Sequence, residues 1–381
     1  MVMTMQWETL ASQTTYTLRR SGRFLVAELN HEHQVLSTSA RNGGQASHVR
    51  YLLNHQSCEG TGHLDRHAVI VDGGLEAYHN LVCGEAGIPS ESAAVMGTAA
   101  NMNYVGLAHE SDEDLRVTAA VTAGVEGNAT AAGEPAAWRE TADGIRKVSD
   151  YSGTINTLLL VNRPMTPGTL ARAAVTMTEG KTAALQRLAV PSKRYIDLAT
   201  GTGTDQFCLA APVEGLPVLT SASTHMKFGE LIGVAVRRAT MEALRWQNGL
   251  EASYTRGLFH ALGRFGIREA SIFEELASLL GASDLELLKK NAKAVFYEPL
   301  VGASAHALAT TCDRVRYGTI PEGVAADAMV QQAASLAANL AAQVHRWAEF
   351  RSRLRPLADQ DVKALVLAAV ALGWSEKWRT S

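Results

Sequence analysis

The chain has few cysteines, no long apolar run and little excess charge. Its four cysteines, spread over 381 residues without a CxxC pair, are too few for a disulfide framework. We therefore expect reduced, buried thiols at Cys58, Cys83, Cys208 and Cys312. No stretch approaches the roughly 18 apolar residues of a membrane span, and the first twenty residues lack the basic start and apolar core of a secretory signal.

The chain also lacks a large excess of acidic or basic residues. The formal net charge is −3, and basic and acidic residues are interspersed. This pattern predicts no nucleic-acid partner and no membrane partner, because both require a clustered basic surface. We expect a soluble, cytoplasmic protein that acts on a small molecule or on another protein.

The sequence changes character near residue 250. With 46% hydrophobic and 19% charged residues, it is long enough for one large or two smaller globular domains. Strand and helix patterns alternate irregularly before residue 250, and alanine-rich helical patterns follow it. We therefore predict an α+β domain over 1–249 and a helical region over 250–381.

Several segments of the first region have strand patterns. TTYTLR and RFLVAEL flank Ser21-Gly22 as a predicted hairpin, and VLSTSA follows at 35–40. LRVTAAVTA (115–123) alternates apolar and polar residues, which predicts a half-buried strand. TINTLLLV (154–161) is apolar on both faces, which is typical of a central strand.

Helices are expected at about 75–87, 167–188 and 225–248. Because hairpins occur beside these helices and strict βαβ alternation is absent, we predict an α+β fold with a mixed, largely antiparallel sheet and flanking helices. The all-α region should include a helix capped by SDLE (283–286), with Ser283 and Glu286 as its capping box, and a long helical segment over 323–354. Its alanine-rich faces are candidates for a homodimer interface.

Small and polar residues gather where four of these segments end. The segments are RNGG (41–44), TAGVEGN (122–128), SGTIN (152–156) and ATGTGTD (199–205). The last lacks the spacing and the lysine of a phosphate-binding P-loop. One glycine-rich strand end is a turn, whereas four predict a cleft. The candidate binding residues are Asn42, Gly43, Gly44, Thr122, Gly124, Asn128, Gly153, Thr154, Asn156, Thr200, Gly201 and Gly203.

Two predicted helices add ionisable candidates. Glu179 and Lys181 point about 200° apart on a regular helix, so both cannot serve one site, and we favour Glu179. Thr224 is a plausible N-cap for the following helix, which would place His225 and Lys227 in its first turn. The positive end of the helix dipole there suits an anion or developing negative charge. Each of these residues could equally be an ordinary surface residue.

The sequence gives little support for a metal site or for a serine nucleophile. His63 and His67 are four residues apart and near His55, but HLDRH lacks the glutamate of HExxH and follows a glycine-rich stretch. We expect neither a metal nor a cofactor. No Gly-x-Ser-x-Gly occurs, and a threonine nucleophile remains open.

The segments RNGG, TAGVEGN, GTINTLLLV, MTPGTLARAAVTMTEGKTAAL, ATGTGTD and LTSASTHMKFGELIG resemble, in order and spacing, the adenosylcobinamide amidohydrolases. The resemblance covers about 35–248. Gly180 stands where an alanine is expected, which weakens the helix slightly. Residues 250–381 fall outside the resemblance.

The resemblance implies hydrolysis of the amide between aminopropanol and the corrin ring of adenosylcobinamide, with release of adenosylcobyric acid in corrinoid salvage. The corrinoid would be the substrate, and its cobalt would take no catalytic part. Glu179 or Asp205 could act as base toward water, with His225 as acid or electrostatic partner and the backbone N–H groups of 201–204 as oxyanion donors. Alternatively, Thr202 or Thr204 attacks directly. A corrinoid-binding or regulatory protein without turnover, or an amidohydrolase acting on another cobamide, would share these features.

Overall fold

The computed structural model describes residues 6–57, 63–136, 138–142, 144–147 and 153–377. Its contacts divide the chain into two compact units. The N-terminal unit comprises Met1–Arg194 and Leu198–Leu250, and the helical unit comprises Glu251–Ser381 together with the short segment Tyr195–Asp197.

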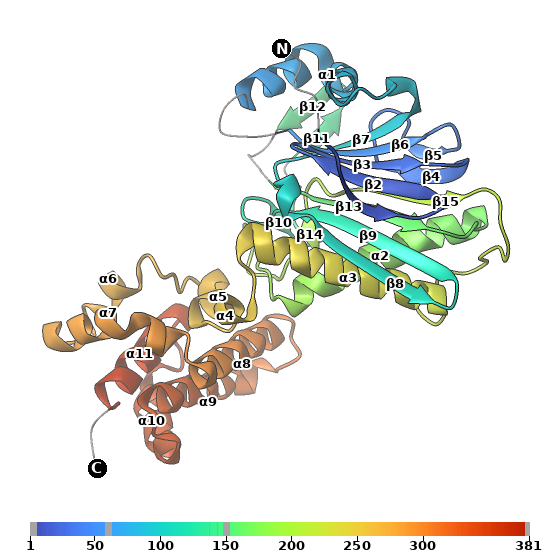
Figure 1. The fold of residues 1–381 in the computed structure, drawn as a ribbon. Helices are drawn as coiled ribbons and strands as arrows, with labels where there is room; N and C mark the ends of the chain where they lie inside the picture. Colours follow the sequence, from blue (N-terminus) through green and yellow to red (C-terminus); the bar gives the residue numbers. More distant parts are fainter. Residues whose placement is uncertain (1–5, 58–62, 137, 143, 148–152, 378–381) are drawn as a thin grey trace. The chain divides into compact units, whose positions relative to one another are not determined.

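Two sheets form the N-terminal unit (Figure 1). The first sheet has the order β1-β2-β3-β6-β7, with β1 Glu8–Ser12, β2 Tyr16–Ser21, β3 Phe24–Leu29, β6 Tyr51–Gln56 and β7 Ala93–Thr98. The second has the order β5-β4-β15-β13-β9-β8, with β5 Gly44–Ala46, β4 His33–Ser37, β15 Gln206–Pro212, β13 Ile155–Val161, β9 Leu115–Ala123 and β8 Gly106–Asp112. Only the pairs β6/β7 and β13/β15 are parallel in these two sheets. The structure thus confirms mixed, largely antiparallel sheets.

Two short ribbons complete the strands of this unit. The strands β10 Ala129–Thr130 and β14 Gly201–Thr202 pair with each other, as do β11 Trp138–Thr141 and β12 Gly144–Lys147. The β10/β14 ribbon joins the chain after β9 to the chain before β15, and so ties two of the polar strand ends together.

Helices cover the outer faces of the two sheets, which gives four layers (Figure 1). Side chains of both sheets, among them Leu18, Leu52, Leu158 and Cys208, fill the space between them. Helix α1 (His63–Ala86) packs on the first sheet, and α2 (Pro167–Arg187) and α3 (Lys227–Asn248) pack on the second. Short 3-10 turns lie at Ser90–Ser92 and Met102–Tyr104.

The strand β9 is more buried than its sequence predicts. In a half-buried strand its alternating threonines would be exposed, yet Thr118 and Thr122 are each 1% exposed. They face the first sheet, where Thr118 accepts a hydrogen bond from the Tyr16 hydroxyl (2.7 Å) and Thr122 accepts one from Asn54 (2.7 Å). The half-buried prediction is wrong because hydroxyls can be buried once they are hydrogen-bonded.

The predicted helices of this unit are present with shifted starts. Helix α1 is broken at Gly74, whose φ of 71° no helical residue adopts, so the predicted 75–87 segment is its second half. Helix α3 begins at Lys227 with Met226 as its N-cap, and no side chain caps it. The prediction of a Thr224 cap is therefore wrong: Met226 N–H bonds to the Ser223 carbonyl (2.9 Å), which places Thr224 and His225 in a turn before the helix.

The helical unit is all-α over the residues that the structure describes. Its helices are α4 Ala252–Thr255, α5 Leu258–Leu262, α6 Ile272–Leu276, α7 Ala282–Phe296, α8 Pro299–Arg316, α9 Glu322–Ala341, α10 Trp347–Leu354 and α11 Val362–Ser375. Short 3-10 turns lie at Gly263–Phe265, Val344–Arg346 and Arg355–Leu357. One apolar core, with Phe296, Leu336, Phe350 and Val370 among its members, holds these helices together.

Two details of this unit differ from expectation. Helix α7 begins at Ala282 after Gly281, without a side-chain cap, so the capping box is wrong: Ser283 lies inside the first turn, and Glu286 bonds to Lys289 (2.7 Å). The long 323–354 segment is interrupted at Ala342, which adopts a left-handed conformation (φ 57°) and ends α9.

Among the described residues, none of the helices has the length and hydropathy of a membrane span. Cys83, Cys208 and Cys312 are free and buried, as predicted, whereas Cys58 lies outside the described residues.

Candidate active site

Three of the four polar segments meet at one edge of the second sheet. Strands β13 and β15 run parallel, with Asn156 opposite Gln206, so the residues that precede them share an edge. Strand β9 is antiparallel to β13 and ends there, with Ala123 opposite Ile155. Strand pairing thus brings together 122–128, 153–156 and 199–205, which are distant in the sequence.

Asp205 is the centre of this cluster. Its Oδ1 accepts the Thr202 hydroxyl (2.5 Å) and the Ile155 N–H (3.1 Å), and its Oδ2 accepts the Thr202 N–H (3.1 Å) and the Lys181 ammonium. A carboxylate offers about four lone-pair positions. All four therefore have donors from the protein itself.

Helix α2 supplies Lys181 to this carboxylate. The Lys181 and Asp205 side chains are 14% and 18% exposed, and they form an ion pair. Gly201 makes room for it, because a Cβ at that position would overlap Asp205 Oδ2 and lie 2.7 Å from Lys181 Nζ. Glu179, two residues earlier on α2, has a side chain that is 51% exposed, with Arg172 as its ion-pair partner (3.9 Å). The structure places Lys181, and not Glu179, at the loop.

Asn128 and Gly153 support the loop from the β9 side. The buried Asn128 donates through Nδ2 to the Gly153 carbonyl (2.8 Å) and to the Thr204 hydroxyl (3.2 Å). Thr204 in turn donates to the same carbonyl (2.8 Å). Gly153 has φ 122°, and a Cβ there would lie 2.8 Å from the Gly124 carbonyl oxygen, so only glycine fits without strain.

A buried polar chain links the loop to the first sheet. The Thr154 hydroxyl donates to the Thr204 carbonyl (2.6 Å), and it also lies 3.3 Å from Asn156 Oδ1. Asn156 donates to Asn54 (2.8 Å) and to the Gly97 carbonyl (3.0 Å), and Asn54 donates to Thr122. Such a satisfied buried network fixes the two sheets and the loop relative to one another.

The start of the loop is also held. Thr200 N–H donates to the Thr130 carbonyl (3.0 Å), its hydroxyl accepts from Ala132 N–H (2.9 Å), and its carbonyl accepts the Thr182 hydroxyl (3.0 Å). Gly203 passes Asn128 closely, because a Cβ on it would lie 3.2 Å from Asn128 Oδ1. The result is a rigid loop that presents a hydroxyl, a carboxylate and an ammonium together.

The segment 41–44 is only partly at this edge. It follows Thr38, which exchanges hydrogen bonds with Phe207 (3.0 and 2.9 Å). Asn42, however, donates to the carbonyls of Ser90, Glu91 and Ala93 near the start of β7 (2.8–3.3 Å). Gly43 packs so closely on the Ser39 carbonyl that a Cβ would overlap it, and Gly44 has φ 73°. These residues form a hydrogen-bonded turn.

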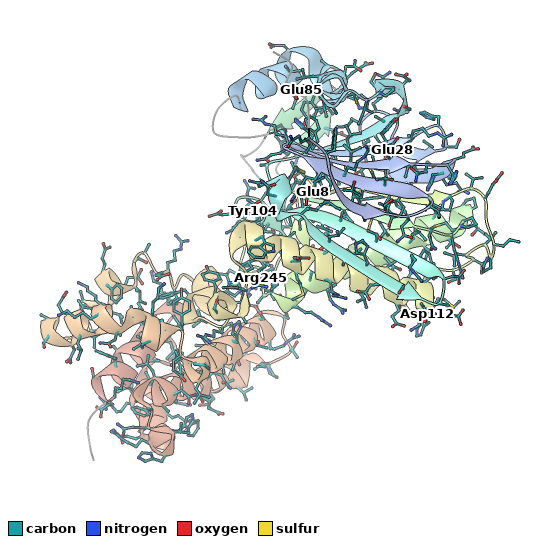
Figure 2. All side chains as sticks on the ribbon, in the orientation of Figure 1. Glu8, Glu28, Glu85, Tyr104, Asp112 and Arg245 are labelled. Carbon is teal, nitrogen blue, oxygen red and sulfur yellow. The ribbon has the colours of Figure 1, made fainter. Side chains whose placement is uncertain are left out.

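His225 and Lys227 lie at the opposite end of the second sheet. A small cavity contains Lys227 together with Asp112, Leu115 and Arg163, whereas the other end of α3 bonds through Asn248 to Val125 (3.2 Å). Figure 2 shows the same separation, with Asp112 at one end of β8 and Tyr104 and Arg245 near the other. The side chains of His225 and Lys227 are exposed, and Lys227 forms an ion pair with Glu230 (2.7 Å). The structure does not bring His225 to Asp205.

Lys181, Asn54 and Gln206 are not among the site residues predicted from the sequence, where Glu179 was favoured over Lys181. The Gln206 side chain accepts the Gly97 N–H (3.1 Å) and so helps to fix the strand β7 beside the network. The signal for Lys181 was its place directly after Gly180, on the buried side of α2. Gly180 packs against Gly233 of α3. Asn54 had only one signal, its place directly after YLL, the apolar start of its strand.

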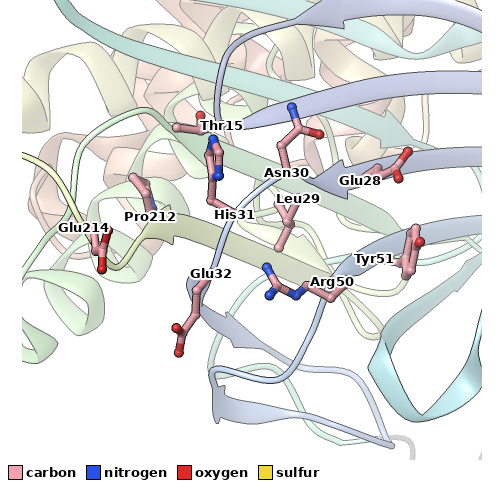
Figure 3. A pocket seen from close by; sticks show the side chains of 10 residues that line it. All are labelled: Thr15, Glu28, Leu29, Asn30, His31, Glu32, Arg50, Tyr51, Pro212 and Glu214. Carbon is pink, nitrogen blue, oxygen red and sulfur yellow. The ribbon is translucent and has the colours of Figure 1, made fainter.

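A separate cavity of about 690 Å³ lies at the far end of the sheets (Figure 3). Leu29, Tyr51 and Pro212, at the end of β3, the start of β6 and the end of β15, line it together with His31, Glu32, Arg50 and Glu214. It shares no residue with the network around Asp205.

The described residues contain no group of three metal-ligating side chains. His55 is buried and bonded to the Tyr78 hydroxyl (2.8 Å), and the side chains of His63 and His67 lie outside the described residues. Burial raises the pKa of Cys208 to about 12, which disfavours the thiolate form needed for metal ligation.

Comparisons with known proteins found one matching family and similar individual proteins. The family model of the adenosylcobinamide amidohydrolases matches residues 8–252. The uncharacterized protein MJ1613 of Methanocaldococcus jannaschii is 33% identical over 237 residues, which are 60% of this chain and 88% of that protein. Among solved structures, the PH0078 protein from Pyrococcus horikoshii OT3 aligns with 63% of this chain and 83% of its own length, at 13% identity and a TM-score of 0.30. The helical unit beyond residue 252 lies outside the family match.

Proposed function

The chain belongs to the adenosylcobinamide amidohydrolase family, and we propose that it hydrolyses the amide between aminopropanol and the corrin ring of adenosylcobinamide. The products would be adenosylcobyric acid and free aminopropanol, as corrinoid salvage requires. The observation that carries a hydrolytic mechanism is the 2.5 Å hydrogen bond from the Thr202 hydroxyl to Asp205.

In this proposal Thr202 is the nucleophile. Its Oγ1 adds to the amide carbonyl carbon while its proton passes to Asp205, which already accepts that hydrogen bond. The same proton then goes to the aminopropanol nitrogen as the C–N bond breaks, leaving an ester on Thr202. Water hydrolyses the ester to the free acid and restores the hydroxyl.

Lys181 supplies positive charge beside the reacting groups. Its ammonium contacts Asp205 Oδ2 and so holds the carboxylate in place. The same positive charge would stabilise the negative charge that develops in the tetrahedral intermediate. The Thr202 N–H is already bonded to Asp205 and is not free to bind an oxyanion. Lys181 therefore takes the electrostatic role that the sequence alone suggested for His225.

The contacts favour Thr202 over the alternatives. Thr204 donates its proton to the Gly153 carbonyl, which cannot act as a base. A water molecule would need a free lone pair on Asp205, and all four of its positions have donors. Glu179 is exposed and paired with Arg172.

The test is to incubate chelator-treated protein with adenosylcobinamide and to follow the corrinoids by liquid chromatography and mass spectrometry. We expect adenosylcobyric acid and aminopropanol from the wild type, and a loss of about 10⁶-fold in Thr202→Val, which removes the nucleophile. Thr204→Val separates the two threonine mechanisms, because it should lose less activity than Thr202→Val. Equal activity in Thr202→Val and wild type would exclude the threonine mechanism, and tight binding without turnover by wild type would make the protein a corrinoid binder.

A further inference from the structure

The cavity of about 690 Å³ lies where the chain passes between the two sheets, at the end opposite to Asp205 (Figure 3). Leu29 ends β3 in the first sheet, and residues 30–32 lead into β4 of the second sheet. The chain crosses back after β5, and Arg50 directly precedes β6 of the first sheet. All residues that line the cavity belong to the N-terminal unit, so the cavity is formed by that unit alone.

Backbone hydrogen bonds fix the wall of this cavity. Leu29 N–H donates to the Arg50 carbonyl (2.9 Å), and Val213 N–H donates to the Glu32 carbonyl (3.0 Å). These bonds join the connecting segments to each other and to the chain that follows β15. The side chains of the wall therefore project from a fixed backbone, as in a preformed binding site.

Charged side chains of both signs line the cavity without partners. In the part of the chain that the structure describes, no hydrogen bond or ion pair engages the side chain of Arg50, Glu32 or Glu214. Glu28, which also lines the cavity, differs because it forms an ion pair with Arg19. Figure 3 shows the three unpaired side chains around the same cavity. These groups are available to a ligand that carries charges of both signs.

Two buried polar atoms at the cavity also have no hydrogen-bond partner among the described residues. One is Thr15 Oγ1, on a residue that lines the cavity, and the other is Nε2 of His33, which is 1% exposed and pairs with Pro212 across β4 and β15. Burial lowers the pKa of His33, and the charge of Arg50 contributes, so the imidazole is neutral at neutral pH. Its Nδ1 donates to the His31 carbonyl (2.8 Å), which leaves Nε2 as an acceptor. Buried polar atoms are normally hydrogen-bonded, so these two atoms point to a polar partner.

We propose that this cavity is a second binding site, and that it takes a small zwitterion with an ammonium group and a carboxylate or phosphate group. The guanidinium of Arg50 binds the anionic group through two parallel hydrogen bonds. Glu32 and Glu214 bind the ammonium group. The observation that carries the proposal is the presence of unpaired groups of both signs in one preformed cavity. Because the cavity shares no residue with the network around Asp205, the proposal does not rest on the proposed function.

Isothermal titration calorimetry of the full-length chain tests the class of ligand. The probes are two zwitterions, ethanolamine phosphate and L-serine, and two molecules that keep one charged group each, ethanolamine and inorganic phosphate. We expect a zwitterion to bind about 10- to 100-fold more tightly than either single-charge probe, because each charged contact adds to the affinity. Binding of only one zwitterion would identify the anionic group as phosphate or carboxylate. Failure of both to bind, or equal binding of inorganic phosphate, would overturn the proposal.

Variants of exposed residues test the place of binding. We expect Arg50→Gln to weaken zwitterion binding by about 10- to 100-fold, and the double variant Glu32→Gln with Glu214→Gln to do the same. Arg187→Gln is the matched control, because Arg187 is exposed and lies outside the cavity. Lys181→Met, which removes the positive charge beside Asp205, should leave the affinity unchanged. Unchanged binding in Arg50→Gln, or loss of binding in Lys181→Met, would overturn the assignment of the cavity.

Discussion

The Thr202 hydroxyl lies 2.5 Å from Asp205 Oδ1 and donates its hydrogen to it, within a loop whose carboxylate also contacts Lys181. Thr202 is only 8% exposed. A hydroxyl that already donates to a carboxylate needs little reorganisation to lose its proton, which is the arrangement that an activated nucleophile requires.

Lys181 and Glu179 of α2 should differ sharply in their effect on activity. We expect Lys181→Met to lower the rate by about 10²-fold, because it removes the charge beside Asp205. Glu179→Gln should stay within about twofold of wild type, because its side chain is exposed and away from the loop. Steady-state kinetics of both variants check this, with circular dichroism to verify folding. The reverse order would return the role of base to Glu179.

His225 should be dispensable. It lies just before α3, at the end of the second sheet away from Asp205, and β9 alone spans nine residues, or roughly 30 Å. We expect His225→Gln to leave kcat and its pH profile unchanged. A large loss of kcat in a folded variant would contradict the placement of the active site at Asp205.

Gly106 should be intolerant of a side chain. A Cβ there would overlap the Ala239 carbonyl of α3, so Gly106→Ala should lower the free energy of unfolding by about 1–3 kcal/mol. The control is Gly84→Ala in α1, where nothing lies within 4 Å of the added Cβ and the free energy should rise by up to about 1 kcal/mol. Urea denaturation of both measures the difference. Equal stabilities would show that α3 can move away from β8 at low cost.

Three cysteines should resist alkylation in the folded protein. Burial raises the pKa of Cys83 to about 11 and those of Cys208 and Cys312 to about 12, so few thiolates form near pH 8. Iodoacetamide followed by peptide mapping should label them only after denaturation. Rapid labelling of Cys208 in the native protein would show that the space between the sheets opens.

The contribution of Asp197 to stability should disappear in acid. Hydrogen bonds from Arg316 and Tyr317 lower its pKa below the ordinary value of 3.8. A lowered carboxyl pKa stabilises the fold above the unfolded-state value, and the gain is lost as the pH falls through the folded-state value. The stability difference between wild type and Asp197→Asn should therefore be constant at neutral pH and shrink below about pH 4. A difference independent of pH would show that the carboxylate charge is not involved.

The fold class and the central strand could be predicted from local sequence patterns. TINTLLLV is apolar on both faces, which indicates a central strand. In the neighbouring segments, the spacing of the apolar residues distinguishes strands from helices. Both patterns are local, so the sequence alone shows them. It also determined the family, because six motifs occur in one order. The change to helices after residue 250 was visible in the same way. The homodimer remains a prediction.

The side of α2 that faces the loop and the end of the sheet that holds the site depend on contacts between distant residues. Lys181 and Glu179 differ by a rotation about the helix axis, and that rotation is fixed by packing of Gly180 against α3. His225 and Asp205 are twenty residues apart, yet the intervening β15 carries the chain to the opposite end of the sheet. Asn54 reaches Thr122 only because the two sheets stack. Helix phase, strand direction and sheet stacking arise from contacts between distant residues, and no local pattern encodes them.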